Sequence, residues 1–522
     1  MNALIKNRIA GSFIARAALA ASGGFISSLA FPRENLWPLI FVAVFALTLS
    51  VYRLSALKSF FIGLIGGLAF YLSQIEWLSL YLGPVPWLAL SVLEAFIFAV
   101  GMATLSLVWR YLDKNLPKQS SLRTLALASA IAVIWTAREW VSISLPYGGF
   151  PWSRLAQSQS DSVLAKWVYW GGLGWLTFIV ALVSAIFVVW FVKEKNWTVK
   201  SEITAAIALV LCFVIPATTK IDTTQSSGSI VVGAVQGNAN AGLFSNEVRG
   251  SILRNHLDAS LLLESKNNDL VPEVVVWPEN ASDLSPFQSA AAKSAITKFV
   301  DQQIKVPLIF GTITERGDSI YNSSILWQPS LGATDWYDKK RPVPFAEYVP
   351  DRDFWYQLAP DLIGLVSRGY SFGTRDGIFE VNNAQLGALI CFEIAVDDIG
   401  RDLVHQGAQV ILSQTNNADF GRSDETFQQA AFAKLRAIET GRTVVNISTV
   451  GVSAIYEIDG SVLQELPTFE AGAMIEKIQL RDHLTPGVYF GGYIDLGLNL
   501  IAAALVLLSL RFALKRKTKE HA

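Results

Sequence analysis

The sequence predicts a polytopic helical membrane domain of eight spans joined to an α/β domain. Hydrophobic residues make up 52% of the 522 residues and charged residues only 16%, well below the roughly 25% of a typical soluble protein. Most of the apolar excess lies in residues 10–219 and 487–511. A chain of this length is also too long for one ordinary core. We therefore expect a membrane domain with spans one to seven over residues 1–225, an α/β domain over 228–482, and span eight with a basic tail over 485–522.

Seven apolar segments precede the α/β domain and one follows it. Each approaches or exceeds the roughly 20 residues that a helix needs to cross a bilayer. The segments are centred near residues 23, 44, 70, 98, 131, 177, 209 and 498. Ala18-Leu19-Ala20 is similar to a signal-peptide cleavage site, but we expect the first segment to be retained as a span.

Basic residues gather in every second loop between these segments, and the alternate loops carry one arginine or none. The basic groups include Arg53 and Lys58, then Arg110, Lys114, Lys118 and Arg123, then Lys193, Lys195 and Lys200, and finally Lys515, Arg516, Lys517 and Lys519. Loops rich in lysine and arginine stay on the cytoplasmic side of a membrane. We therefore expect both termini in the cytoplasm and residues 228–482 outside.

Five charged residues fall within the apolar segments: Glu76, Glu94, Arg138, Glu139 and Asp495. Ionisable side chains at membrane depth are unfavourable unless they are paired or hydrated. We expect interior pairing or contact with a lipid headgroup. For Arg138 and Glu139, a position near a span end with the side chain reaching toward water is an equally open interpretation.

The outer domain alternates short apolar runs with amphipathic helices. Runs bounded by Gly, Asn or Pro predict strands at 230–236, 274–277, 307–311, 385–391, 410–414, 444–448 and 453–458. Helical periodicity predicts helices at 251–264, 287–300 and 424–440, the last closed by Gly441. This alternation indicates an α/β domain with a layered sheet. Residues 351–373 are rich in aromatics, fit neither period and predict a long loop.

Composition excludes several classes of function. The net charge is −1, and no basic patch is interleaved with aromatics, so we expect no nucleic-acid partner. The sequence has no metal-ligand cluster, P-loop or convincing dinucleotide fingerprint, so we expect no cofactor and no metal. The two cysteines are Cys212 in an apolar segment and Cys391 in the α/β domain. A disulfide between a membrane span and a domain interior is not expected.

Cys391 is the first candidate for chemistry. It ends an apolar run and is followed two residues later by Glu393. A free cysteine at a strand end is usually a small buried hydrophobe. Outside the membrane, however, an unpaired thiol is exposed to oxidation and is a liability unless it is used. We therefore interpret Cys391 as a nucleophile.

Glu279 follows Trp277-Pro278 at the end of a run of three valines. It can be an ordinary acid in a loop, or a general base that takes the thiol proton and returns it to a leaving group. Shelter from water by Trp277 would raise its pKa and suit that exchange near neutrality.

Lys339 and Lys340 lie in a basic run, which is often a solvated face. An ammonium beside the thiol would instead lower the thiol pKa and hold an oxyanion. Glu347 is placed to orient such a lysine, or caps a turn. None of the four histidines lies in a motif that suggests a protease-type pair with Cys391.

Together these residues resemble the Glu–Lys–Cys triad of the carbon–nitrogen hydrolase (nitrilase) superfamily, and more closely the apolipoprotein N-acyltransferase family, its membrane-embedded branch. The motifs that carry the resemblance are Leu29-Ala30-Phe31-Pro32, Leu36-Trp37-Pro38-Leu39, Gly149-Phe150-Pro151-Trp152, Val235-Gln236-Gly237-Asn238, Trp277-Pro278-Glu279, Tyr337-Asp338-Lys339, Val343-Pro344-Phe345-Ala346-Glu347-Tyr348 and Ile390-Cys391-Phe392-Glu393. They cover nearly the whole chain. The resemblance implies an αββα sandwich for the outer domain.

By that resemblance, Glu279 is the base, Lys339 the oxyanion-stabilising amine and Cys391 the nucleophile, with Glu347 and Glu393 in support. The chain also departs from the family pattern. Ala346 replaces a frequent glycine, Phe392 a tyrosine and Asp419 the aromatic of Asn-Asp-Ala-Trp-Phe-Gly, and Thr449-Val450-Gly451 stands where the family has Asn-Asn-Gly. These departures affect the expected substrate pocket and leave the triad intact.

The resemblance implies a multi-pass protein of the bacterial plasma (inner) membrane with its catalytic domain on the outer side. We expect a monomer that transfers an acyl chain from a phospholipid, through a Cys391 thioester, to the α-amino group of a diacylglyceryl-modified apolipoprotein. Two alternatives remain open: a membrane-tethered amidase of the same superfamily, and a non-catalytic scaffold or transporter.

Overall fold

The computed structural model describes residues 12–194, 197–240, 248–265, 270–366 and 369–520. The chain divides into two compact units. One is helical and contains residues 1–79, 83–220 and 490–522, and the other is an α/β unit with residues 80–82 and 221–489. Each unit is described by itself.

Helices form at all eight predicted apolar segments. They are α2 (Phe13–Ser28), α3 (Leu39–Ser50), α4 (Ala56–Gln74), α6 (Pro84–Asn115), α7 (Arg123–Ser142), α8 (Trp167–Val192), α9 (Val199–Thr218) and α17 (Pro486–Glu520). Short elements lie between them, namely η1 (Glu76–Leu78), α5 (Ser79–Leu82), η2 (Leu155–Gln159) and η3 (Val163–Lys166).

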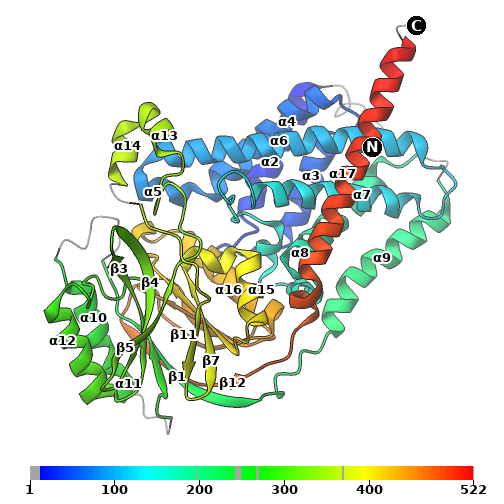
Figure 1. The fold of residues 1–522 in the computed structure, drawn as a ribbon. Coiled ribbons are helices and arrows are strands. Elements are labelled where there is room, and N and C mark those ends of the chain that lie inside the picture. Colours follow the sequence, from blue (N-terminus) through cyan, green and yellow to red (C-terminus); the bar gives the residue numbers. More distant parts are fainter. Residues whose placement is uncertain (1–11, 195–196, 241–247, 266–269, 367–368, 521–522) are drawn as a thin grey trace. The chain divides into compact units, whose positions relative to one another are not determined.

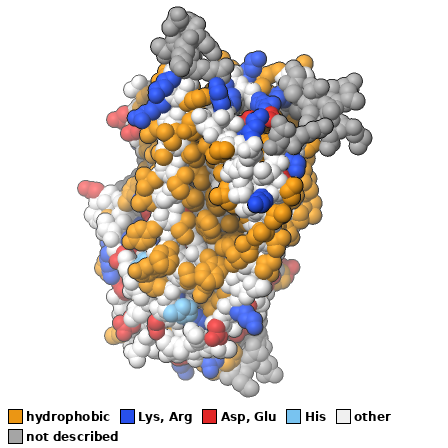
Figure 2. Space-filling view, turned by 90° about the vertical axis from the view of Figure 1, so that its right-hand side faces the viewer, with side chains coloured by type: hydrophobic (Ala, Val, Ile, Leu, Met, Phe, Trp, Pro, Cys, Tyr) orange, Lys and Arg blue, Asp and Glu red, His pale blue; other side chains and the backbone are white. Residues whose placement is uncertain are grey.

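Among the described residues, six helices are long and apolar enough to cross a membrane. The helices α2 and α3 have only 16 and 12 residues. At about 1.5 Å of rise per residue both fall short of a hydrocarbon core roughly 30 Å thick. Figure 2 shows hydrophobic side chains gathered over a broad face of the surface. The exposed apolar residues of this unit include Ile203, Ile207 and Val210 of α9 and Leu496, Leu500 and Leu507 of α17.

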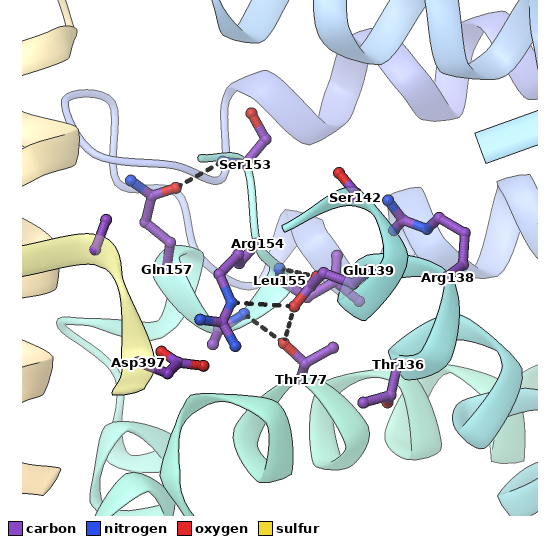
Figure 3. Close-up of polar contacts among 12 residues, drawn as sticks. Thr136, Arg138, Glu139, Ser142, Ser153, Arg154, Leu155, Gln157, Thr177 and Asp397 are labelled. Carbon is purple, nitrogen blue, oxygen red and sulfur yellow. Dashed lines mark hydrogen bonds and ion pairs between the residues drawn. The ribbon is translucent and has the colours of Figure 1, made fainter. Parts of the chain in front are cut away.

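Glu139 lies inside the helical unit and is fully hydrogen-bonded (Figure 3). Its carboxylate accepts hydrogen bonds from Thr177 Oγ1 at 2.6 Å and the Leu155 amide at 2.9 Å. Arg154 Nε approaches the same carboxylate at 3.4 Å, and both side chains are buried. Glu139 is therefore paired in the interior, as one of the two sequence interpretations expected.

Arg138 is also buried and donates through Nη1 to Tyr71 Oη at 2.9 Å. Its guanidinium lies over the rings of Phe98 and Trp135, at 5.0 and 5.3 Å from their centroids. Such contacts stabilise a desolvated cation. Glu94 pairs with Ser142. The alternative in which Arg138 and Glu139 reach toward water is therefore wrong, because the bundle supplies partners for both.

The α/β unit contains two six-stranded sheets (Figure 1). In sheet order, the first consists of β12 (Gly472–Leu480), β1 (Gly228–Gln236), β2 (Val274–Val276), β3 (Leu308–Arg316), β4 (Ser319–Gln328) and β5 (Gly332–Asp338). The second consists of β11 (Val462–Leu466), β10 (Ser453–Tyr456), β9 (Val444–Ser448), β8 (Val410–Thr415), β7 (Ala384–Ile390) and β6 (Ile378–Val381). In each sheet three central strands pair in parallel, and antiparallel strands flank them.

Alternation along β1 builds two cores. Ile230, Val232 and Ala234 pack with Leu386, Ala388 and Leu412 of the second sheet. Val235, on the opposite face, joins a core with residues of α10 (Ser251–Ser260) and α12 (Ala290–Lys298). Successive strand residues point to opposite faces, so one strand serves both layers.

Further helices of this unit are α11 (Leu262–Ser265), the π-helix η4 (Phe299–Ile304), α15 (Asp397–His405) and α16 (Glu425–Thr440). α15 and α16 pack against the second sheet, on strands β7, β9 and β10. The unit is thus layered helix, sheet, sheet, helix. The predicted helix at 424–440 is confirmed, and Gly441 ends it in the left-handed conformation at φ +63°.

Several predictions from the pattern were wrong. Residues 351–373 contain α13 (Arg352–Leu358) and α14 (Pro360–Leu365) instead of a continuous loop. No side chain of α13, all of whose residues are described, is buried, so this helix does not pack an apolar face into the core. The pattern also missed β4, β5, β6, β11 and β12. β4 buries polar side chains, and β5 and β11 are half-exposed strands at sheet edges.

Candidate active site

The structure brings Glu279, Lys339 and Cys391 together, each just after a strand. Glu279 follows β2, Lys339 follows β5 and Cys391 follows β7. Lys339 Nζ lies 3.3 Å from Glu279 Oε1, and the Cys391 thiol contributes a hydrogen bond to the Glu279 side chain. The three residues come from separate parts of both sheets, so the sandwich itself assembles the group.

Lys339 bridges two carboxylates. Its Nζ lies 2.9 Å from Glu347 Oε2 in addition to its contact with Glu279, and the lysine side chain is 2% exposed. Glu347 is itself held by the Val343 amide, which donates to Oε2 at 2.6 Å. Glu347 therefore orients the lysine, as the sequence suggested.

Asn322 of β4 is a site residue that sequence reasoning missed. Its Nδ2 donates to Glu279 Oε1 at 2.7 Å and to Glu347 Oε1 at 2.8 Å. One buried amide thus fixes both carboxylates on either side of Lys339. The only signal in the sequence is a buried-strand pattern interrupted by Asn322-Ser323-Ser324, and it was not read as a strand.

Gly311 of β3 lets the backbone approach Glu279 closely. A Cβ at this position would lie 2.6 Å from the Glu279 Cα and 2.7 Å from the Pro278 oxygen. These separations are well below van der Waals contact, so glycine is needed to place the carboxylate at the end of β2.

Cys391 adopts the left-handed region at φ +53°. Strand β7 ends at Ile390, one residue earlier than predicted, and Cys391 begins the 3-10 turn η5 (Cys391–Ala395). A non-glycine residue in this conformation is strained and persists where its surroundings hold it. The sharp turn leaves the sulfur side chain only partly buried.

Glu393 and Arg436 hold this turn. Glu393 accepts hydrogen bonds from the Ile390 amide at 2.9 Å, the Lys340 amide at 2.7 Å and Tyr337 Oη at 2.9 Å. Arg436 of α16 donates to the Ile394 and Ala395 carbonyls at 3.0 and 3.2 Å. Glu393 is therefore a support that ties the cysteine turn to the lysine segment, and Arg436 is a second support that sequence reasoning missed.

The Lys340 side chain plays no part in this cluster. Its Nζ pairs with Asp376 at 2.5 Å, and both side chains are partly exposed. Of the two adjacent lysines, Lys339 is therefore the one that faces the carboxylates and the thiol.

Burial and charge set the protonation states of the site. Burial raises the pKa of the Glu279 carboxyl, although Lys339 lowers it. Burial lowers the pKa of Lys339, but Glu347 and Glu279 outweigh burial and leave that pKa well above its ordinary value. Burial and Glu279 likewise raise the pKa of the Cys391 thiol well above its ordinary value, despite Lys339.

The resting thiol is therefore neutral and Lys339 is charged, with the Glu279 carboxyl group in contact with both. Lys339 does lower the thiol pKa, as expected, but burial and Glu279 outweigh it and the net direction is upward. The arrangement suits a base that removes the thiol proton only as the sulfur attacks. Among the described residues, no group of three or more His, Cys, Asp and Glu side chains is placed to hold a metal ion.

Asp419, which stands where the family has an aromatic residue, lies in η6 (Ala418–Phe420) and is half-buried. Burial, with a contribution from the Glu279 charge, raises the pKa of Asp419 to about 6. The neighbouring Phe420 ring stacks on Tyr81 with 5.6 Å between centroids. Another departure, Phe392, is buried in η5.

A cysteine, a carboxylate and a lysine at strand ends of a two-sheet sandwich define the carbon–nitrogen hydrolase class. The family description "Carbon-nitrogen hydrolase" matches residues 256–483. A second description, "Apolipoprotein N-acyltransferase N-terminal domain", matches residues 23–186 in the helical part. The chain belongs to the apolipoprotein N-acyltransferase family.

Named relatives agree with this assignment. The chain is 32% identical to the apolipoprotein N-acyltransferase of Mycolicibacterium smegmatis over 294 residues, which cover 54% of this chain and 48% of that protein. It is 26% identical to the same-named protein of Vibrio cholerae over 510 residues, which cover 94% of this chain and 95% of that protein. Among solved structures, the amidase from Nesterenkonia sp. AN1 is similar over 50% of this chain and 95% of its own, with 17% identity and a TM-score of 0.37.

Proposed function

We propose that this protein transfers an acyl chain from a membrane phospholipid to the α-amino group of the N-terminal diacylglyceryl-cysteine of a lipoprotein. The observation that carries the proposal is the contact of Cys391 and Lys339 with one buried carboxylate, Glu279, in a chain that also has long apolar helices. The names of the relatives supply the acceptor class and the acylated nitrogen, and the phospholipid donor is taken from the family resemblance.

The first half-reaction forms a thioester. Glu279 takes the proton of the Cys391 thiol as the sulfur attacks the ester carbonyl carbon of the phospholipid. Lys339 donates to the oxyanion of the tetrahedral intermediate. The intermediate collapses, the C–O bond breaks, and the lysophospholipid leaves with the proton from Glu279.

The second half-reaction forms the amide. The α-amine of the acceptor attacks the thioester carbonyl, Glu279 takes the amine proton, and the C–S bond breaks. Cys391 leaves as a thiolate and recovers its proton. Glu347 and Glu393 act in support, because Glu347 orients Lys339 and Glu393 holds the turn that carries Cys391.

The proposal includes a topology. Eight spans cross the bacterial plasma membrane, seven within residues 1–225 and one within 485–522, and the catalytic domain, residues 228–482, lies on the outer side. The alternation of basic loops supports this orientation. The short helices α2 and α3 are counted among these spans, because a bilayer can thin around a short hydrophobic stretch. The proposal also takes the enzyme to be a monomer, and it is compatible with this that one chain supplies all three catalytic residues.

The test is mass spectrometry of the purified protein after incubation with phospholipid. We expect an acyl adduct on Cys391 that disappears when a diacylglyceryl lipopeptide is added, with a triacylated product. In Cys391→Ala, neither adduct nor product should form. If membranes with that variant still N-acylate the lipopeptide, the proposal is wrong. An adduct that water discharges as fast as the lipopeptide would instead indicate an amidase-type hydrolase.

A further inference from the structure

Gln429 of α16 places an amide donor on the sulfur of Cys391. Its Nε2 lies 3.4 Å from Cys391 Sγ, and the glutamine side chain is buried. Its Oε1 accepts a hydrogen bond from Asn417 Nδ2 at 2.7 Å. Because the oxygen is engaged by Asn417, the NH₂ group is the end that faces the sulfur.

Asn417 is itself locked in one orientation. Its Oδ1 accepts from Ser448 Oγ at 2.5 Å and from Thr415 Oγ1 at 3.1 Å. Its Nδ2 donates to Gln429 and, at 2.7 Å, to Glu425 Oε2. Both acceptor positions and both donor hydrogens of the amide are therefore used. A flip of Asn417 would set its Oδ1 against two acceptors, Gln429 Oε1 and Glu425 Oε2, in a buried site.

The surroundings leave this chain little freedom to move. Glu425, Asn417 and Gln429 are all at most 2% exposed. A Cβ at Gly451 would lie 2.5 Å from Asn417 Oδ1 and 2.1 Å from Thr426 Oγ1. The backbone at 451 therefore packs directly on the amide, and only glycine fits there.

We propose that Gln429 is a catalytic residue whose Nε2 hydrogen-bonds the Cys391 thiolate, with Asn417 and Glu425 as the positioning pair that keeps its amide turned to the sulfur. The inference rests on the proposed function, in which Cys391 is the nucleophile. The thiolate occurs twice in that cycle, as the attacking group and as the leaving group. A donor to the sulfur favours both steps.

The charges of the site explain why such a donor is needed. Lys339 is the cation of the catalytic group, but its Nζ is shared between Glu279 and Glu347 at 3.3 and 2.9 Å. Burial and the Glu279 charge raise the pKa of the Cys391 thiol. A neutral amide stabilises the sulfur anion without neutralising the base, because it does not pair with Glu279.

The experiment measures the pH dependence of Cys391 alkylation by iodoacetamide in the full-length protein. A Cys212→Ala background leaves Cys391 as the single thiol, since the chain has 2 cysteines. We expect Gln429→Leu to raise the apparent thiol pKa by about one unit and to slow alkylation at pH 7 about tenfold, as for the loss of a hydrogen bond to a charged group. Gln428→Leu is the matched control, because Gln428 is buried on the same helix and points about 100° away.

Gln429→Glu keeps the shape but replaces the donor with an acceptor, so it should raise the thiol pKa further than leucine does. This variant tests the inference if the leucine variant does not fold. An alkylation profile of folded Gln429→Glu that matches the wild type would overturn the inference. Alkylation needs neither lipid nor acceptor. Slower alkylation of the Gln429 variants would therefore support the role of Gln429 even if the wild type showed no acyl transfer. That absence of acyl transfer would refute the proposed function.

Discussion

The helical unit and the α/β unit both bury charged side chains, but they balance them differently. In the helical unit, Glu139 has three donors around one carboxylate, and Arg154 is a cation beside it. In the α/β unit, Lys339 stands between two carboxylates next to a thiol in a strained backbone turn. The Glu139 carboxylate has hydrogen-bond donors and a cation beside it. The Lys339 group contains a reactive sulfur and two carboxyl groups for one cation.

The comparison teaches how to separate structural from functional buried charge. A buried charge that is paired and hydrogen-bonded helps to select one packing arrangement. Removal of such a charge is expected to lower the free energy of unfolding. A carboxylate whose pKa is raised and that faces a nucleophile is placed for proton transfer, and its loss is expected to appear in rate. The predictions below test whether the two groups separate in this way.

The largest effect is expected for Glu279→Gln. Glutamine keeps the shape and the contact with Asn322 but cannot take the thiol proton, so acylation of Cys391 should slow by roughly 10³-fold. Thermal stability should change little, because Lys339 retains Glu347. Single-turnover formation of the acyl adduct, measured with the melting temperature in detergent, checks both. Glu380→Gln, at an exposed position of strand β6, is the control. A large loss of stability with an unchanged rate would place Glu279 with the structural charges.

Lys339→Met should slow acylation by about 10²- to 10³-fold, because the oxyanion loses its charged donor. It should also lower stability, since Glu279 and Glu347 are left buried without their cation. Lys340→Met is the matched control: its pair with Asp376 is partly exposed and such pairs contribute about 1 kcal/mol or less. Equal effects of the two substitutions would contradict the assignment of Lys339.

Sequence reasoning predicted the chemical groups better than the scaffold that orients them. Glu279 and Cys391 are marked by strand-end motifs, because these reactive side chains follow buried apolar runs. Lys339 was found through its basic run and the motif Tyr337-Asp338-Lys339, since its strand β5 is half-exposed. Asn322 could not be found in this way. It lies within a strand whose inward face is polar, so the pattern that identifies strands is absent there.

The membrane part shows the same limit. Hydropathy located all eight helices, because the apolar excess is strong and continuous. It could not predict that α3 has only 12 helical residues, since helix length depends on where the chain turns to pack. Gln429 was within a predicted helix, but its contact with Cys391 arises from tertiary packing of α16 on η5, which no local pattern reports.

Glu139→Ala tests the structural group. It removes the acceptor of Thr177 and Leu155 and the carboxylate beside Arg154, which should lower the free energy of unfolding by about 3 kcal/mol. The acylation rate of the folded protein should stay near that of the wild type. Thermal melting in detergent measures the loss, and Glu76→Ala, at an exposed acid of η1, is the control. A rate loss at unchanged stability would remove the distinction drawn between the two units.

The smallest effect concerns Glu425, whose pKa burial raises from 4.5 to about 8. A carboxyl with a raised pKa binds its proton more tightly in the folded state. Its stabilising contribution is therefore complete below pH 4.5 and is lost as the pH rises toward 8. Between pH 6 and pH 8 the free energy of unfolding should fall by about 2 kcal/mol more in the wild type than in Glu425→Gln, which carries no titrating group at this position.

Thermal melting of both proteins at the two pH values checks this difference. Glu279 and Asp419, whose charges add to the shift, are present in both proteins, so their own titration largely cancels. If the wild type and Glu425→Gln lose the same stability, Glu425 is ionised at neutral pH. The α/β unit would then hold a further buried anion beside its thiol, and the contrast with the balanced charges of the helical unit would be sharper still.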